Sequence, residues 1–372
     1  MLFNISGIYK LKDSIEVFSS QENEKNLIQF YRINTRESIY IKSDDQILFF
    51  LSLMDGKRTL KDIVNEYNFE LESVTRFIDF LLKNGIIKEI KLSEFNYVDE
   101  RYKRQVAYFD DLLGVSDDED IQQKIKHKKV VIFGLGSVGS AIAILLARMG
   151  VGYFVFIDYK RVKTSHFIKH IYCNNANLGK FKTDALKDYL LEINSSINIE
   201  VFHEKILPQT DLAKFISKNS DLIINTADEP YIGHISMKIG RYAWDINIPF
   251  YVGGGFDAHS MSTGEMIIPN VTPCIDCYVE SFKIALKDYH PTYIKNFSPK
   301  SKDNKNIILG GPGSIAACSL FSASFGVLRI IYYFLGLQCD VTNRGEYLID
   351  KGVIKYTTLE HVRRKNCEIC KQ

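Results

Sequence analysis

The sequence has almost no net charge. It holds 47 lysine and arginine residues against 45 aspartate and glutamate residues, which gives a formal net charge of +2. A protein that binds nucleic acid or an anionic membrane through electrostatics carries a basic excess or a basic stripe on one face. We therefore expect neither nucleic acid nor a membrane among the partners of this chain.

Long apolar runs are missing as well. A segment needs about 18 apolar residues to cross a bilayer, and the longest candidate, residues 316–337, is interrupted by Ser319, Ser322, Ser324 and Arg329. The first residues, MLFNISGIYKLKDS, lack the basic-then-apolar order of a secretory signal. We predict a cytoplasmic protein.

The composition is that of a folded globular protein. Of the 372 residues, 46% are apolar and 25% are charged, which is enough core for two domains. Internal repeats and low-complexity tracts are absent. The patterns divide the chain into a small unit, a connector with the acidic stretch SDDED, and a large domain, at residues 1–92, 93–128 and 129–372.

The small unit has the pattern of a winged helix. An Asp55-Gly56 turn, a cap at Thr59 and two amphipathic helical segments predict a helix-turn-helix, with Gly85 ending the second helix. A DNA-binding fold and a structural cap are the plain interpretations. The second helix, however, carries only Arg76 and Lys83 as cations, too few to read a duplex.

This unit resembles the PqqD-like precursor-recognition element of enzymes that modify ribosomally made peptides. The shared signatures are DG-x-x-T-x-x-x-I and F-x-x-x-L-x-x-x-G-I-I. The resemblance implies a groove in which a leader peptide adds a strand to a sheet edge.

From residue 129 to about residue 270, buried strand-like runs alternate with helical runs. KVVIFGL, YFVFID, DLIINTA and PFYVGG are such runs, with helical segments between them. This alternation predicts an α/β domain with a doubly wound, mainly parallel, Rossmann-like sheet.

Three glycines follow the first of these runs. In VVIFGLGSVGSAIAILLARMG, Gly134, Gly136 and Gly139 form G-x-G-x-x-G between a strand and a helix. The glycines permit a tight turn and close backbone approach, and the free amides at the helix start face an anion. Asp158 closes the next strand about 20 residues further on, where an acidic side chain binds ribose hydroxyls. The segment favours nucleotide binding over a plain tight turn.

A nicotinamide dehydrogenase would share these features. Five other motifs, in a fixed order along the chain, argue against a dehydrogenase. They are RYKRQ at 101–105, GKFK at 179–182, NTADEP at 225–230, TPCIDC at 272–277 and CEIC at 367–370. Together they resemble the ThiF/MoeB/MccB-like family of ubiquitin-activating-enzyme-like adenylyltransferases, over about residues 100–372. The resemblance implies ATP and Mg²⁺ as cofactors.

The resemblance also implies roles for three residues. Attack of a carboxylate on the α-phosphate of ATP joins two anions, so the site must supply positive charge. Lys182 matches the catalytic lysine of the family, Asp228 matches a magnesium ligand, and Arg104 matches an arginine that reaches the triphosphate of the neighbouring protomer, which implies a homodimer. On their own residue types, Lys182 is a surface helix lysine and Asp228 is a helix cap near Pro230.

The segment after Asp158 departs from the family pattern D-x-D-x-V-x-x-S-N-L-x-R-Q. Lys160 replaces the second aspartate, His166 the asparagine, Lys169 the arginine and His170 the glutamine. Lys169 keeps the charge without the planar two-pronged geometry, and His166 can still donate one hydrogen bond. Both stay among the predicted nucleotide-binding residues. Lys160 either aids a tetra-anionic nucleotide or fills its site.

Four of the seven cysteines form two C-x-x-C pairs, Cys274 with Cys277 and Cys367 with Cys370. In a reducing compartment such pairs predict metal before disulfide, and four thiolates suit a closed, structural Zn²⁺ site. A redox role is the alternative. A crossover loop at about residues 283–309 is implied by the resemblance and contains no cysteine, so thioester transfer is not indicated.

The sequence thus predicts an enzyme that adenylates a carboxyl group of a ribosomally made precursor peptide, in peptide natural product biosynthesis of the bacteriocin or microcin type. One alternative is a catalytically inactive relative that binds the leader peptide and presents the precursor to a YcaO-type cyclodehydratase. A second alternative is a sulfur-carrier adenylyltransferase, although such proteins do not need residues 1–92.

Overall fold

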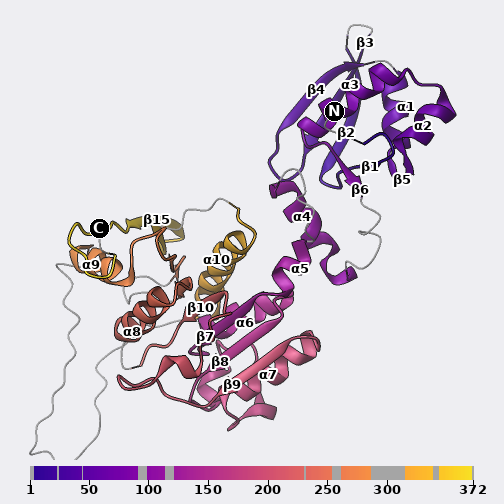
Figure 1. Cartoon of the computed structure of the whole chain (residues 1–372). Coiled ribbons are helices and arrows are strands. Elements are labelled where there is room, and N and C mark those ends of the chain that lie inside the picture. The colour runs from indigo at the N-terminus through magenta and orange to yellow at the C-terminus, as the bar shows by residue number, and fades with distance from the viewer. Residues whose placement is uncertain are drawn as a thin grey trace, which may run out of the picture. The chain divides into compact units, whose positions relative to one another are not determined.

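The computed structural model divides the chain into two compact units, Met1–Lys124 and Ile125–Gln372 (Figure 1). The predicted connector, residues 93–128, therefore spans the boundary between the two units. The structure describes residues 4–22, 25–43, 45–90, 99–113, 121–229, 232–253, 261–285, 315–337 and 343–370.

The first unit contains two three-stranded sheets and several helices. One sheet has the order β2-β3-β4 and the other has the order β5-β1-β6. The strands are β1 (Ile8–Leu11), β2 (Ile15–Glu22), β3 (Lys25–Arg32), β4 (Ser38–Ser43), β5 (Asp55–Thr59) and β6 (Ile87–Ile90). The helices are α1 (Asp45–Leu53), α2 (Leu60–Tyr67), α3 (Leu71–Lys83), η2 (Glu100–Tyr102) and α4 (Lys103–Leu113), and α5 (Ile121–Lys126) crosses the boundary to the second unit. Apolar side chains from both sheets and from α1 to α3 form the core of this unit.

In the first unit the predicted cap at Thr59 is confirmed and the predicted Asp55-Gly56 turn is wrong, while the winged-helix fold itself stays a prediction. Thr59 caps α2, because its hydroxyl accepts a hydrogen bond from the Asp62 N–H at 3.1 Å. Asp55 and Gly56, predicted as a turn, lie in β5, whose pairing with β1 is irregular. Gly56 has φ +76°, which fits a β-bulge. The PqqD-like assignment stays a prediction, and SDDED lies outside the described residues.

The second unit is built on a six-stranded sheet of order β13-β11-β10-β7-β8-β9. All neighbouring strands pair in parallel except β11 and β13. The strands are β7 (Lys129–Phe133), β8 (Tyr153–Ile157), β9 (Asn198–Phe202), β10 (Leu222–Asn225), β11 (Phe250–Val252) and β13 (Glu265–Ile267). The chain winds outward from β7 in both directions, so the predicted doubly wound α/β class is confirmed.

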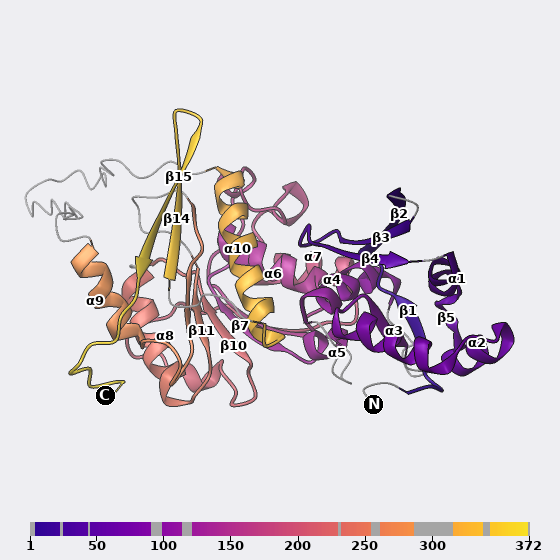
Figure 2. The same cartoon turned by 90° about the horizontal axis from the view of Figure 1, so that it is seen from above.

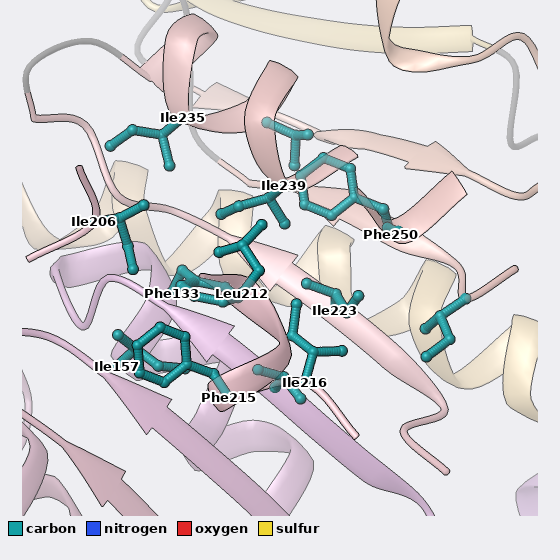
Figure 3. Close-up of a cluster of buried hydrophobic side chains, with 14 of the residues drawn as sticks. Phe133, Ile157, Ile206, Leu212, Phe215, Ile216, Ile223, Ile235, Ile239 and Phe250 are labelled. Atoms are coloured by element: carbon teal, nitrogen blue, oxygen red, sulfur yellow. The ribbon is translucent and has the colours of Figure 1, made fainter. Parts of the chain in front are cut away.

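Helices cover both faces of this sheet. The helices are α6 (Ser137–Arg148), α7 (Lys182–Ile193), α8 (Ile232–Asp245), α9 (Ile275–Ala285) and α10 (Ala316–Phe334), with short turns η3 (Thr164–His166), η4 (Asn175–Asn177) and η5 (Leu212–Lys214). Figure 3 shows Ile235 and Ile239 of α8 packed over strand residues such as Phe133 and Ile223. On the other face α6 contacts α7 and α10. Strands β12 (Met261–Ser262), β14 (Asn343–Asp350) and β15 (Val353–Glu360) form a small further sheet (Figure 2).

Helix α10 differs from the expectation that no segment reaches spanning length. It has 19 residues and a mean hydropathy of 1.4, so it passes the criteria for a membrane span by length and composition. A core helix passes the same test, and α10 has a core helix's contacts. The Ser322 hydroxyl accepts the Ser262 N–H at 3.0 Å, and Arg329 donates to the Gly264 carbonyl at 3.0 Å. These polar contacts place α10 in the packing of the second unit.

His361 is buried in this unit, and its ring nitrogens make no hydrogen bond to the described residues. It is 3% exposed and stacks on Tyr278 with ring centroids 3.9 Å apart. Burial lowers the pKa of His361 to about 3. The folded protein therefore keeps this ring neutral, whereas the unfolded chain protonates it below about pH 6.5. The ring makes stability fall as the pH drops below that value.

We expect His361→Phe to stabilise the protein, and more so in acid. The phenyl ring keeps the stacking and removes both orphaned nitrogens. Because one pKa unit is worth about 1.4 kcal/mol, the advantage over wild type should grow by about 2 kcal/mol between pH 7 and pH 5. Urea unfolding at the two pH values measures this. An advantage that is the same at both would contradict the assignment of a neutral buried ring.

Candidate nucleotide-binding site

A cavity of about 690 Å³ opens at the carboxyl ends of β7, β8, β9 and β10. Open α/β sheets bind ligands at this edge, where the strand order reverses. Eight of the predicted nucleotide-site residues line the cavity: Gly134, Gly136, Gly139, Asp158, His166, Lys169, Lys182 and Asp228. The fold therefore brings together residues that are up to 94 positions apart in the chain.

The glycine loop is shaped by its contact with the end of β10. A Cβ at Gly134, which has φ +84°, would clash with the Ala227 backbone, and a Cβ at Gly139 would clash with the Gly134 carbonyl and the Thr226 hydroxyl. That hydroxyl donates to the Gly134 carbonyl at 2.6 Å. A Cβ at Gly136 would meet nothing within 4 Å. Gly134 and Gly139 therefore close the turn, while Gly136 leaves open space beside the first amides of α6, as an anion site requires.

Asp158 has a structural role that the sequence did not reveal. It is 8% exposed, and its two carboxylate oxygens accept the N–H groups of Leu135 and Lys160, both at 2.8 Å. The carboxylate thus ties the glycine loop to the loop after β8. Each oxygen can accept a further hydrogen bond, so binding of ribose hydroxyls stays compatible with these contacts.

Lys182 is not the surface lysine that its residue type alone predicts. It is the first residue of α7 and only 4% exposed, and its N–H donates to the Lys160 carbonyl at 2.9 Å. Burial lowers the pKa of Lys182, while the carboxylates of Asp158 and Asp228 oppose that shift. Burying a lysine without a close ion pair lowers stability, because the ammonium group loses its hydration. Strongly perturbed buried groups of this kind cluster at functional sites.

His166, the last residue of η3, and His170 stack on each other. The His166 and His170 ring centroids are 4.7 Å apart with an interplanar angle of 6°. Burial and the charge of Lys182 lower the pKa of His166 to about 4 and that of His170 to about 3, so both rings are neutral at pH 7. The Lys163 N–H donates to Nδ1 of His166 at 3.0 Å, so the ring proton of His166 lies on Nε2 and can be donated.

His166, His170 and Cys173 also place potential metal-ligating atoms within 4.8 Å of one another. A ring nitrogen binds metal along its in-plane lone pair. Because the two stacked rings are nearly parallel, their lone pairs lie in separate planes and do not converge on one ion. Nδ1 of His166 is also already occupied. The geometry does not favour a metal centre here.

Two loops meet across the cavity at a residue that sequence reasoning missed. Glu229 accepts hydrogen bonds from Lys160 Nζ at 2.6 Å and from the Tyr159 hydroxyl. The hydrogen bond to Glu229 raises the pKa of Tyr159 to about 12, and the hydrogen bonds from Lys160 and Tyr159 lower the pKa of Glu229. The only sequence signal was its place beside Asp228 in NTADEP. Asp228 itself is exposed on the cavity wall.

The four paired cysteines form a single cluster. Sγ of Cys274 lies 3.9 Å from that of Cys277 and 3.5 Å from that of Cys367, and Cys277 and Cys370 are 3.8 Å apart. Four thiolates about 2.3 Å from a tetrahedral Zn²⁺ lie about 3.8 Å apart, whereas a disulfide needs about 2.05 Å. The donor set and its spacing fit Zn²⁺.

The comparisons with known proteins agree with this geometry. The model of the ThiF family matches residues 102–344. The chain belongs to the ThiF family. A molybdopterin-synthase adenylyltransferase of Haemophilus influenzae is 31% identical over 153 residues, 41% of this chain and 58% of that protein. An adenylyltransferase and sulfurtransferase MOCS3 of Culex quinquefasciatus is 29% identical over 128 residues, 34% of this chain and 27% of that protein. The chain thus spans less than two thirds of the length of each of these relatives.

Among solved structures, Escherichia coli MccB with ATP has the same fold over nearly the whole chain. Its TM-score is 0.70 at 20% identity, and the match covers 98% of this chain and 99% of that chain. Another structure is described as the microcin C7 biosynthetic enzyme MccB in complex with N-formylated MccA. The predicted ThiF/MoeB/MccB-like fold is confirmed.

Two further features predicted from the ThiF family are Arg104 and the crossover loop. Arg104 is exposed on α4 in the first unit and does not line the cavity, so its contact with a neighbouring protomer stays a prediction. Of the predicted crossover loop, only residues 283–285 are described, at the end of α9. Cys173 is buried and Cys318 is half-buried, and Cys339 lies outside the described residues.

Proposed function

We propose that this ThiF-family protein is an ATP-dependent adenylyltransferase that activates a carboxyl group of a ribosomally made precursor peptide. The observation that carries the proposal is the buried Lys182 at the wall of a cavity that also presents the glycine loop, Asp158 and Asp228. The relatives from Haemophilus influenzae and Culex quinquefasciatus are named as adenylyltransferases, and the fold of MccB covers both units.

The residues divide the chemistry between them. The first amides of α6 bind phosphate oxygens, Asp158 binds the ribose, and His166 and Lys169 contact the nucleotide from the segment after β8. Lys182 offsets the charge that develops when the peptide carboxylate attacks the α-phosphate and pyrophosphate leaves. Asp228 would hold Mg²⁺, which shields the phosphates from the incoming carboxylate. The products are an acyl-adenylate and pyrophosphate.

The same proposal covers the partners. The first unit binds the leader segment of the precursor, in a homodimer whose Arg104 reaches the neighbouring protomer's cavity, and the reaction takes place in the cytoplasm. MccB supports peptide binding by this fold, because it has been solved with MccA. Zn²⁺ in the four-cysteine cluster is structural and takes no part in the chemistry.

One observation favours the second candidate, a non-catalytic partner that presents the precursor to a YcaO-type enzyme. The two histidines that replace family residues are neutral, and Lys160 is paired with Glu229, so the cavity offers an incoming triphosphate less free positive charge. A sulfur-carrier adenylyltransferase is favoured only by the name of relatives such as the adenylyltransferase and sulfurtransferase of Culex quinquefasciatus.

Pyrophosphate release separates these functions. Purified protein with Mg-ATP should release pyrophosphate when a candidate precursor peptide is added, and should release none with a sulfur-carrier protein ending in Gly-Gly. The protein could instead bind the peptide tightly, release no pyrophosphate and show no ATP binding in calorimetry. That result would contradict the adenylyltransferase and support the non-catalytic presenting partner.

A further inference from the structure

Lys160 contacts three other residues that line the cavity. Its N–H donates to Asp158, its carbonyl accepts the N–H of Lys182, and its ammonium group pairs with Glu229. One residue thus connects the loops after β8 and β10 and the start of α7. Its backbone contacts hold the wall together whatever its side chain does.

The ion pair of Lys160 can be broken at low cost. The two side chains are 34% and 46% exposed, and pairs with this exposure are held weakly. Glu229 keeps a partner when Lys160 leaves, because the Tyr159 hydroxyl still donates to it, and the charge of Lys205 also helps to hold the pKa of Glu229 below its ordinary value. The Lys160 ammonium group is therefore an exchangeable cation at the edge of the cavity.

A nucleotide bound in the cavity would bring phosphate groups that can pair with the Lys160 ammonium group. Lys160, Lys169, Lys182 and Lys205 line the cavity, but so do the carboxylates of Asp158, Glu204, Asp228 and Glu229, and the four positive charges are matched by four negative ones. A polyphosphate must compete with these carboxylates for each ammonium group. Lys182 is fixed at the start of α7, whereas Lys160 has a partly exposed side chain that can turn toward the glycine loop.

We propose that Lys160 and Glu229 form an electrostatic latch: Glu229 holds the Lys160 ammonium group while the site is empty, and a bound nucleotide takes that group for its phosphates. This inference rests on the proposed nucleotide site. Lys160, which replaces the second aspartate of the family pattern, would then contact the phosphates of the nucleotide. Glu229 would compete with the phosphates for the Lys160 ammonium group and so lower nucleotide affinity. The latch ties the affinity of the site to a residue that touches no nucleotide.

The latch predicts that substitutions of Lys160 and of Glu229 change nucleotide affinity in opposite directions. Calorimetric titration of the full-length protein with the non-hydrolysable analogue AMPCPP and saturating Mg²⁺ measures the affinity. Lys160→Gln should weaken binding at least about tenfold, the usual size of one charge-assisted hydrogen bond. Glu229→Gln should tighten binding about two- to fivefold, the range expected for a partly exposed pair. The double variant should behave like Lys160→Gln, because the latch has no effect without its ammonium group.

Matched variants separate the latch from a general loss of charge or of fold. Lys160→Arg should bind within about threefold of wild type, because the positive charge is kept. Lys163→Gln removes the same charge three residues away, outside the cavity lining, and should leave the affinity unchanged. Thermal unfolding of each variant confirms the fold.

A purely structural ion pair gives a different result. Both single variants would then weaken binding alike, and that outcome, or weaker binding by Glu229→Gln alone, overturns the latch while leaving the nucleotide site intact. A wild-type protein that binds no AMPCPP overturns the proposed function together with the latch.

Discussion

Replacing Lys182 with alanine should lower peptide-dependent pyrophosphate release by two to three orders of magnitude. Donors aimed at charge that develops in a transition state are worth roughly 10²- to 10³-fold in rate when they act from a water-poor site. Lys182 is 4% exposed and lines the cavity. The other lysines of the cavity are more exposed and reach it from other loops, so none can take its place.

A substitution that removes the Lys182 charge but keeps the bulk of the side chain should not destabilise the protein. Burial lowers the pKa of Lys182, which means that the folded state disfavours the ammonium form relative to the unfolded chain. Its stability penalty is felt below the ordinary lysine pKa, so Lys182→Met should unfold at the wild-type temperature or slightly above it. Rate and stability then move independently, as expected for a residue kept for chemistry.

Lys180→Ala is the matched control for Lys182. Lys180 stands two residues earlier, is exposed, and pairs with Asp188 at 3.4 Å on the surface. Its loss should leave pyrophosphate release within about twofold, since exposed pairs contribute little. If Lys182→Ala released pyrophosphate at the wild-type rate, the buried lysine would have no part in the reaction.

The parallel sheet was predictable because local patterns report burial. Runs such as VVIF and LIIN are apolar on both faces, as only strands covered by helices on both sides can be. The bulge at Gly56 was not predictable. An Asp-Gly pair has the local preferences of a turn, and only pairing with β1, more than forty residues earlier in the chain, draws it into a strand.

The site shows the same division between local and tertiary information. The glycine loop and Asp158 carry local signals, namely backbone freedom and a position at a strand end. The burial of Lys182 depends on the loop at Lys160, and the role of Glu229 depends on two loops that lie 69 residues apart. Contacts of this kind arise from the order of strands in the sheet, which places β10 next to β7, and no periodicity within a segment encodes that order.

Loss of one cysteine from the four-cysteine cluster should unfold the end of the second unit. The cluster joins the start of α9 to the segment after β15, and Cys274, Cys277 and Cys367 are at most 3% exposed. Apart from the sulfurs, only a few apolar side chains pack there. Because metal-binding free energy becomes folding free energy, we expect one Zn²⁺ per chain and a Tm for Cys277→Ser lower by about 10 °C, at roughly 2–4 °C per kcal/mol for a unit of this size.

Cys318→Ser tests whether this loss is specific to the cluster. Cys318 is half-buried on α10 and does not belong to the four-cysteine cluster, so the same substitution should keep the full zinc content and shift the Tm by about 2 °C or less. Elemental analysis and thermal unfolding measure both quantities. A strong chelator should reproduce the effect of Cys277→Ser in wild type, whereas a thiol reductant should have none, because the sulfurs are spaced for a shared ion rather than for disulfide bonds. Wild-type protein that lacks zinc and loses stability on reduction would instead assign these cysteines a redox role.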